Sequence, residues 1–293
     1  AGNEIHWWSC RADDSCGAGP RIDSMHRAAI PPRFMPAKVL PRVKAALLEQ
    51  AWAPWAAKRL AQTIAAITPD CIWAIPHNWS ILPLHHVFFS PAGKSVRWHA
   101  TIQDYPDIHG NVGCWGRGTA ARMAWFQREI YRNSTSRDAT SLPMLDDLEA
   151  ATGCAGVQML HEGLEPEDFA YLDRESEHHR VGHLRIAYAG TILAQREFAL
   201  FVAALDRLRA KGSPMTLEFW SAHSYAAEPW FERNWMQEHG HKNREQLVHD
   251  LRECDWGFIP MALTDDDPRY NRFSFPTKFI TYLAAGLPII SMG

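Results

Sequence analysis

The sequence lacks the short signatures that identify the commonest cofactor and metal sites. It contains no G-x-x-x-x-G-K-[ST] phosphate loop, and its 15 histidines form no H-E-x-x-H zinc motif. Gly113, Gly116 and Gly118 do not have the G-x-G-x-x-G spacing of a dinucleotide site, and no clear strand precedes them. The acidic run 265–267 lacks the alternating ligands of a calcium loop, so we interpret it as a solvated turn before Pro268. The sequence therefore carries none of these motifs for a metal or another cofactor.

Paired cysteines and membrane-spanning runs are also lacking. None of the six cysteines forms a C-x-x-C pair, and only Cys10 and Cys16 lie close together in the sequence. These two could form a disulfide or half of a metal site, although reduced thiols are the default. The longest uncharged stretch, 71–93, contains three prolines and three histidines, which excludes a membrane span. We expect a cytoplasmic protein, at most in contact with the inner face of the membrane.

The composition is that of a globular protein, with 46% hydrophobic residues, 22% charged residues and a net charge of −3. A charge so close to neutral argues against nucleic acid as the main partner. The 293 residues predict two domains. Residues 1–150 carry a charge balance of +3 and residues 151–293 one of −6, so the halves resemble different modules. The chain begins at Ala1 and stops directly after an apolar run, and we expect a fragment that lacks both ends.

The first half of the chain predicts an α/β layer of alternating strands and helices. We expect a strand at 4–9 and a helical stretch at 38–67 that is interrupted at Pro54. Short apolar runs predict further strands at 71–75, 86–89, 96–102 and 156–160, with helices at 118–131 and 142–151.

A basic stretch at 21–59 suggests a contact with an anionic surface. It holds eight basic residues against Asp23 and Glu49. Together with Trp52 and Trp55, these residues could meet anionic lipid headgroups or an acidic acceptor. The alternative is a solvated helix face whose tryptophans pack inward.

The second half predicts a parallel sheet that helices cover on both faces. The polar stretch 165–180, with Pro166, is the best linker candidate. Beyond it we expect strands at 186–189, 216–220, 256–259 and 288–291, with helices at 196–209, 228–238, 244–252 and 276–285.

Ligands of an open parallel sheet bind where strands end and helices begin, and three such places stand out. The first follows the strand at 186–189, where Gly190 would let the backbone approach a phosphate and Arg196 would supply counter-charge. The second is the segment 270–278, in which Pro276 suits a first helical turn, Ser274 or Phe275 its cap, and Lys278 an anion site.

The third place follows the strand at 216–220. Ser221 and His223 come directly after that strand, and His241 and Lys242 follow later. These side chains could flank a base or a sugar. Each of the three places also has an ordinary structural interpretation: a packing turn at Gly190, a capped helix with Lys278 in water, and surface histidines.

Several segments of the second half together resemble the motifs of one enzyme family. YAGT at 188–191, the helix after it and LEFW at 217–220 resemble the start of that family's C-terminal domain. CDWGFIP at 254–260 matches its acidic residue, strand and proline, and FPTK at 275–278, with YLAAGLPII at 282–290, matches its P-x-K and EYLA-x-G-x-P-V-I signature. HEGLE at 161–165 resembles the crossing between its two domains. By these segments the chain resembles the retaining, family-4-like glycosyltransferases of the GT-B type.

The resemblance implies an α/β fold of two Rossmann-like domains that face a cleft. It implies an N-terminal acceptor domain at 1–165 and an incomplete C-terminal donor domain at 180–293. The implied reaction moves a sugar from a nucleotide-diphosphate sugar to a glycan, lipid or small-molecule acceptor, with retention of configuration. Because cations and helix amides would neutralise the leaving diphosphate, no metal would be required.

The resemblance also implies roles for individual residues. Gly190 and Thr191 would touch the donor diphosphate, and Arg196 and Lys278 would neutralise it. A loop would wrap the donor sugar, and its residues are Tyr270, Asn271, Ser274, Phe275 and Pro276. Ser221 and His223 are assigned to the donor side as well.

Two departures from the family pattern bear on these roles. Where relatives often have two glutamates, the second of which holds the ribose, this chain has Phe273 and Thr281. Thr281 would hydrogen-bond a ribose only weakly. Where relatives often have His-Asp at a strand end, the chain has Gln103-Asp104, so Asp104 is the catalytic candidate on the acceptor side. Two other functions stay open: a nucleotide-sugar epimerase of the same architecture, and a catalytically silent nucleotide- or sugar-binding protein.

Overall fold

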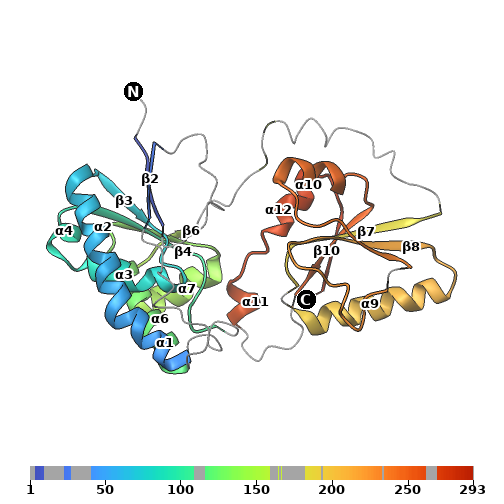
Figure 1. The fold of residues 1–293 in the computed structure, drawn as a ribbon, viewed down its shortest axis with the longest axis horizontal. Helices are drawn as coiled ribbons and strands as arrows, with labels where there is room; N and C mark the ends of the chain where they lie inside the picture. Colours follow the sequence, from blue (N-terminus) through green and yellow to red (C-terminus); the bar gives the residue numbers. More distant parts are fainter. Residues whose placement is uncertain are drawn as a thin grey trace. The chain divides into compact units, whose positions relative to one another are not determined.

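The structure, a computed structural model, describes residues 4–9, 23–27, 41–108, 116–158, 164, 166, 182–192, 194–232, 234–261 and 269–292. The chain forms two compact units (Figure 1). The first comprises Ala1–Met159 with Arg272–Ser274, and the second comprises Leu160–Asn271 with Phe275–Gly293. The expected linker at 165–180 lies outside the described residues except for Pro166.

The first unit is built on a parallel sheet in the order β3-β4-β5-β6. Its strands are β3 (Cys71–Ala74), β4 (Arg97–Ile102), β5 (Ser136–Ala139) and β6 (Val157–Gln158). The connections are η3 (Asn78–Ser80), α3 (Ile81–Phe88), α4 (Pro91–Lys94), α6 (Arg117–Asn133) and α7 (Leu142–Thr152). A separate parallel pair is formed by β1 (His6–Ser9) and β2 (Ser24–Arg27).

The long helical stretch of the first unit stays helical through Pro54. It consists of α1 (Pro41–Leu47), the π-helical turn η2 (Leu48–Trp52) and α2 (Ala53–Ile67). Pro54 lies in the first turn of α2, where its missing N–H disturbs the least, so the expected interruption is a π-turn and not a break. Trp52 is 0% exposed and packs in the core, so it cannot meet lipid headgroups. Of the described helices, none combines the length and the apolar character that crossing a membrane requires.

The strand expected at 86–89 was wrong. These residues end α3, in which Ile81, Leu84, Val87 and Phe88 are buried at helical spacing. A short apolar run does not distinguish a buried strand from a buried helix, and here the period of 3.6 residues decides. The strands β2 and β5 were not predicted, because their polar sequences SMHR and SRDA carry no apolar alternation.

The second unit contains a five-stranded parallel sheet in the order β11-β10-β7-β8-β9. Its strands are β7 (Leu184–Ala189), β8 (Met215–Trp220), β9 (Met236–Glu238), β10 (Trp256–Pro260) and β11 (Ile289–Met292). Its main helices are α9 (Gln195–Ala210), α10 (Arg244–Leu251) and α12 (Lys278–Ala284), and the short α11 (Arg269–Phe273) precedes α12.

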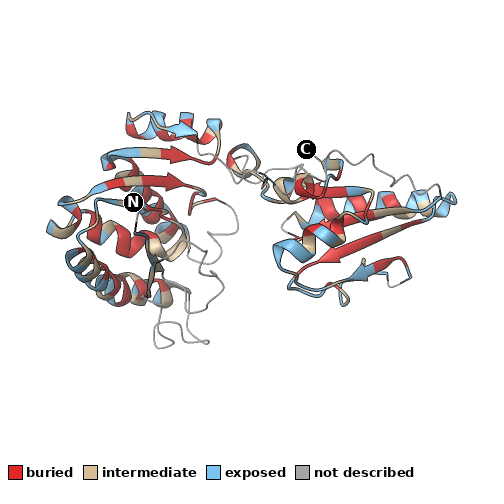
Figure 2. Cartoon of the chain, turned by 90° about the horizontal axis from the view of Figure 1, so that it is seen from above, coloured by how far each residue is buried: buried red, intermediate tan, exposed pale blue. Residues whose placement is uncertain are grey.

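Helices cover both faces of this sheet, as the apolar strands predict. Phe198 and Val202 of α9 pack against Ile186 and Phe219 on one face. Leu251 of α10 and Tyr282 of α12 pack on the other face, in a cluster that also holds Trp220. Figure 2 shows the buried residues concentrated along the strands and on the helix sides that meet them.

The helix expected at 228–238 was also wrong. The segment makes successive turns, with Glu228 N bonded to Tyr225 O at 2.9 Å and Phe231 N to Glu228 O at 3.0 Å, and then enters β9. Its aromatic residues Trp230 and Phe231 pack against Phe219 and the rest of the core. Tertiary packing of aromatics therefore overrides the helical pattern of this segment.

Candidate functional site

The strand order of the second unit indicates where a ligand of this sheet would bind. The order β11-β10-β7-β8-β9 has the strand that comes first in the unit, β7, in its middle, with later strands added on either side. The connections from β7 and β10 therefore run to opposite faces of the sheet, and ligands of such folds bind at the carboxyl ends of these two strands. The Gly190 turn, which we define as residues 190–192, follows β7 directly.

The Gly190 turn has a backbone that only glycine adopts without strain. Gly190 has φ +106°, and its amide donates to the carbonyl of Trp220 at 2.8 Å. A Cβ added to Gly190 would lie 3.0 Å from Cε and 3.5 Å from Nζ of Lys278. Gly190 is therefore needed twice, for its φ angle and for the close approach of the lysine.

Two tyrosines hold the Gly190 turn in place. The Tyr188 hydroxyl donates to the carbonyl of Thr191 at 2.7 Å. The Tyr225 hydroxyl accepts from the amide of Ile192 at 3.1 Å and donates to the carbonyl of Gly190 at 3.2 Å. Sequence reasoning missed Tyr225, because a tyrosine inside an irregular segment carries no local signal of this role.

Lys278 brings a positive charge over the Gly190 turn. Its ammonium nitrogen lies 5.5 Å from the centroid of the Tyr188 ring, a cation–π distance. Burial lowers the pKa of Lys278, and no charged group within the described residues opposes that effect. A half-buried cation without a carboxylate partner favours an anion beside it, because a bound anion compensates the lost hydration.

Tyr282 fixes α12, and with it Lys278, to the two central strands. Its hydroxyl accepts from the amide of Ala189 at 3.0 Å and donates to the carbonyl of Phe258 at 3.2 Å. These contacts join α12 to β7 and β10, the two strands whose carboxyl ends the strand order indicates as the binding place. Burial raises the pKa of Tyr282, so the hydroxyl stays protonated and keeps both roles.

A hollow of about 310 Å³ opens at the carboxyl ends of the neighbouring strands β8 and β9. Its lining includes Phe219, Ser221, His223, Ser224, Glu238 and His241. The amide of His223 donates to Ser221 Oγ at 3.0 Å, and Ser221 Oγ lies 3.4 Å from the Tyr225 hydroxyl. The hydroxyl of Tyr225 therefore connects the hollow with the Gly190 turn.

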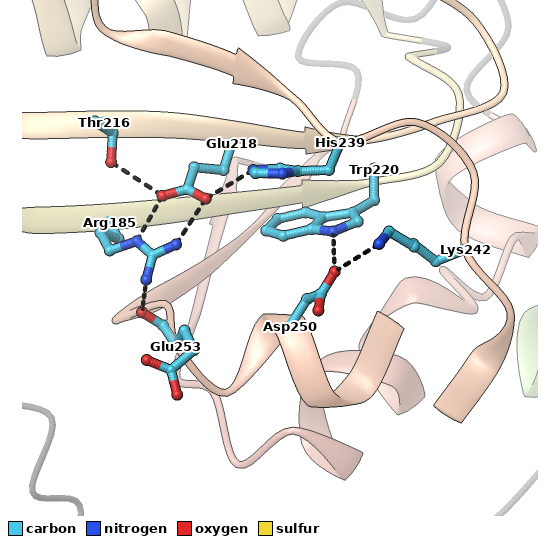
Figure 3. A network of polar contacts seen from close by, with 8 residues as sticks. All are labelled: Arg185, Thr216, Glu218, Trp220, His239, Lys242, Asp250 and Glu253. Carbon is cyan, nitrogen blue, oxygen red and sulfur yellow. Dashed lines mark hydrogen bonds and ion pairs between the residues drawn. The ribbon is translucent and has the colours of Figure 1, made fainter. Parts of the chain in front are cut away.

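An ionic network around the buried Glu218 joins β7, β8 and the residue that follows β9 (Figure 3). Glu218, which is 2% exposed, accepts from Arg185 at 2.6 and 2.9 Å and lies 2.9 Å from His239 Nε2. Burial opposes the ionisation of Glu218, but Arg185 and His239 outweigh it and lower the pKa of the carboxyl. The charged groups of the network pair with one another, so we assign them a structural role.

The same figure shows a second pair of contacts beside the network. Trp220 stacks on His239 with ring centroids 4.6 Å apart and donates its Nε1–H to Asp250 at 3.1 Å. Lys242, which the sequence offered as a ligand-binding residue, lies 3.6 Å from the same carboxylate (Figure 3). The charge of Lys242 is therefore engaged within the unit.

The remaining predicted donor residues do not gather in one cluster. Arg196 is exposed in the first turn of α9. Phe273 and Ser274 belong to the first unit, in which the buried Phe273 ring lies 5.4 Å from the ring of Tyr105. Phe275 contacts Phe279, with ring centroids 6.2 Å apart, at the start of α12.

Four other predicted donor residues lie on α11, on α12 or in the turn between these helices. Asn271 lies in α11, and the side chain of Tyr270 lies outside the described residues. Pro276 accepts from the amide of Phe279 at 2.8 Å, and Thr281 is partly buried on α12.

In the first unit, Asp104 lies at the carboxyl end of β4 beside a histidine. Its Oδ2 is 3.8 Å from Nδ1 of His77, which follows β3. The buried Gln127 of α6 holds the two strand ends together by donating to the carbonyls of Pro76 and Asp104, both at 2.8 Å. His77 was missed because the pairing joins two strands that are distant in the sequence.

No family model matches the sequence, and no curated protein matches it. Solved structures do match. Sucrose-phosphate synthase from Thermosynechococcus elongatus matches with a TM-score of 0.66 at 13% identity, over 98% of this chain and 71% of that one. The N-terminal domain of trehalose-6-phosphate phosphatase from Candida albicans matches with a TM-score of 0.60 at 10% identity, over 98% of this chain and 74% of that one.

A third match is the glycosyltransferase TarM from S. aureus, as its G117R mutant in complex with fondaparinux, α-GlcNAc-glycerol and UDP. Its TM-score is 0.54 at 8% identity, over 81% of this chain and 45% of that chain, so this chain spans less than half of TarM. At such identities the likeness establishes the fold. The chain has the α/β GT-B fold of glycosyltransferases, as its signatures predicted.

Proposed function

We propose that this protein transfers a glycosyl group from a nucleoside-diphosphate sugar, and that the Gly190 turn and Lys278 hold the diphosphate. The observation that carries the proposal is the half-buried ammonium group of Lys278, set over a glycine turn at the end of β7. A diphosphate supplies the negative charge that this position favours. As it leaves, its developing charge would be stabilised by a cation that is already in place.

The hollow beside the turn offers room for the nucleoside. Ser221 and His223, in its lining, would hydrogen-bond the base or the ribose, and the Tyr225 hydroxyl would join this subsite to the phosphate subsite. A UDP complex of TarM, which shares the fold, agrees with such a donor. Arg196 and the loop at 270–276 are further donor-side candidates.

On the acceptor side, Asp104 and His77 form the candidate pair. A carboxylate beside an imidazole can orient an acceptor hydroxyl and take up its proton. The acceptor, whether glycan, lipid or small molecule, and the retention of configuration are parts of the proposal that rest on the family resemblance. So does the expectation that no metal is required.

The test measures binding and turnover separately. Thermal unfolding is recorded with UDP, GDP and their sugars, and a ligand at 100 times its Kd should stabilise the fold by about 2.7 kcal/mol. Sugar transfer or donor hydrolysis is then measured with the ligand that binds, on the unaltered chain and on Lys278→Ala. Binding and turnover that both depend on Lys278 support the proposal. Binding without turnover over a broad acceptor panel supports a catalytically silent binding protein. A nucleotide sugar whose configuration is inverted at one sugar carbon in the absence of acceptor supports the epimerase.

A further inference from the structure

A second cluster of polar side chains lies on the parallel pair β1 and β2, far in the sequence from Gly190 and Lys278. His6 pairs with Ser24 and Trp8 pairs with His26 in the ladder. Residues two apart in a strand point to the same face, so His6, Ser24 and His26 share one face. Trp8 packs against two apolar clusters of the first unit, which ties this face to the core.

Two imidazole nitrogens on this face lie close together. His6 Nδ1 and His26 Nε2 lie 3.5 Å apart, and their rings are stacked with centroids 5.7 Å apart. Ser24 Oγ is within hydrogen-bonding distance of both nitrogens, at 3.1 Å from His26 Nε2. A tetrahedral zinc ion with Zn–N bonds of about 2.0–2.1 Å would hold two nitrogens about 3.4 Å apart. The observed separation matches that value.

The far side of His6 supplies an independent observation. Its other ring nitrogen, Nε2, lies 3.0 Å from a carboxylate oxygen of Glu4. A metal-bound histidine commonly donates its second N–H to a carboxylate, which fixes the tautomer and turns the free lone pair toward the metal. Glu4 would place the His6 proton on Nε2 and leave Nδ1 to bind a metal.

We propose that His6 and His26 bind a divalent transition-metal ion such as Zn²⁺. Imidazole nitrogens suit Zn²⁺ and similar ions better than Mg²⁺ or Ca²⁺. Among the described residues no three His, Cys, Asp or Glu side chains are placed to hold one metal ion together, so the Ser24 hydroxyl and water would complete the coordination. The ion would cross-link two strands of four residues each, a pair that is marginal by itself. The inference is independent of the proposed glycosyl transfer.

Binding of Zn²⁺ alone to the whole chain tests the site. The metal is titrated calorimetrically into the unaltered chain, into His6→Ala with His26→Ala, and into His249→Ala, which removes an exposed histidine of α10. We expect the double variant to lose one equivalent of bound Zn²⁺ and His249→Ala to keep it. Glu4→Gln should weaken this equivalent by about 10- to 100-fold.

A measurement on the unaltered chain covers the case in which the double variant does not fold. Diethyl pyrocarbonate modifies accessible imidazoles, and mass spectrometry locates the modified residues. One equivalent of Zn²⁺ should protect His6 and His26 while His249 stays reactive. Equal modification of His6 with and without Zn²⁺, or a double variant that binds Zn²⁺ like the unaltered chain, overturns the proposal and identifies the cluster as a hydrogen-bonded His–Ser–His relay. Neither result bears on donor binding.

Discussion

At the scale of single residues, variants of Lys278 test whether an anion binds at the carboxyl ends of β7 and β10. Burial penalises its charged form in the folded protein, so removing the charge should not harm folding. We expect Lys278→Ala to unfold at the same or a slightly higher temperature, and kcat/KM for transfer to fall by a factor that corresponds to about 2–4 kcal/mol. Calorimetry and initial rates measure the two effects. A variant that unfolds while its folded fraction keeps full activity would assign Lys278 to structure.

Gly190 allows a matched test of the close approach that Lys278 makes. Gly190→Ala would add strain at φ +106° and a carbon 3.0 Å from Lys278 Cε. Gly212→Ala adds the same kind of strain at φ +93°, but its Cβ meets nothing within 4 Å. Both variants should lose about 1–2 kcal/mol of unfolding free energy, and only Gly190→Ala should also lose affinity for a nucleoside diphosphate. Equal affinity in both variants would contradict the assigned site.

At the scale of elements, Tyr282 joins α12 to the central strands through its hydroxyl. In Tyr282→Phe the buried amide of Ala189 loses its acceptor, which should cost about 1–3 kcal/mol of unfolding free energy. Tyr131→Phe is the control, because the hydroxyl of Tyr131 is buried without a hydrogen-bond partner in the described part of the chain. That variant should be neutral or stabilising. Chemical denaturation of the two variants measures the difference, and similar losses in both would exclude the proposed anchoring role.

The sheet of the second unit depends on the ion pair of Glu218 with Arg185. Breaking a buried pair costs about 3–5 kcal/mol, so Glu218→Gln should be strongly destabilised, whereas Glu228→Gln, at an exposed position outside the network, should not. The pKa of Glu218 is lowered in the folded state, so its stabilising effect is complete above the unfolded pKa of about 4.3 and disappears as the pH falls through the lower folded value. Below about pH 4 the unaltered chain should therefore lose stability more steeply than Glu218→Gln. Parallel pH curves would contradict this assignment.

The elements that could be predicted are those whose sequence carries a period or a signature. The apolar strands β7, β8 and β10 and the amphipathic helix α9 follow from the sequence pattern. Residues 86–89 were assigned wrongly because a short apolar run fits a buried strand and a buried helix equally well, and 228–238 because aromatic packing next to β9 outweighs local preference.

The candidate site divides in the same way. Gly190 and Lys278 could be proposed from the turn and the helix start, and the structure places them in contact. Tyr225, Tyr282 and His77 could not, because each acts across strands that only the fold brings together. Glu218 left one signal that was not used, a charged residue inside an otherwise apolar strand.

At the scale of the whole molecule, the candidate donor features around Lys278 and the candidate acceptor pair lie in different units. A nucleoside diphosphate should therefore slow amide exchange in the second unit, at the Gly190 turn, at α12 and at 221–225. The helices of the first unit, α2 and α3, should be unaffected. Hydrogen exchange with mass spectrometry resolves these segments, and protection confined to the first unit would contradict the division.

The central claim is that the diphosphate of a nucleotide sugar binds beside Gly190 and Lys278, and titration calorimetry tests it most directly. The nucleoside diphosphate that gives the largest thermal shift is titrated into the unaltered chain, into Lys278→Ala and into Lys58→Ala, which removes an exposed lysine of the first unit. We expect a single site whose Kd rises by at least tenfold in Lys278→Ala and stays unchanged in Lys58→Ala. Equal Kd values in all three proteins would contradict the account.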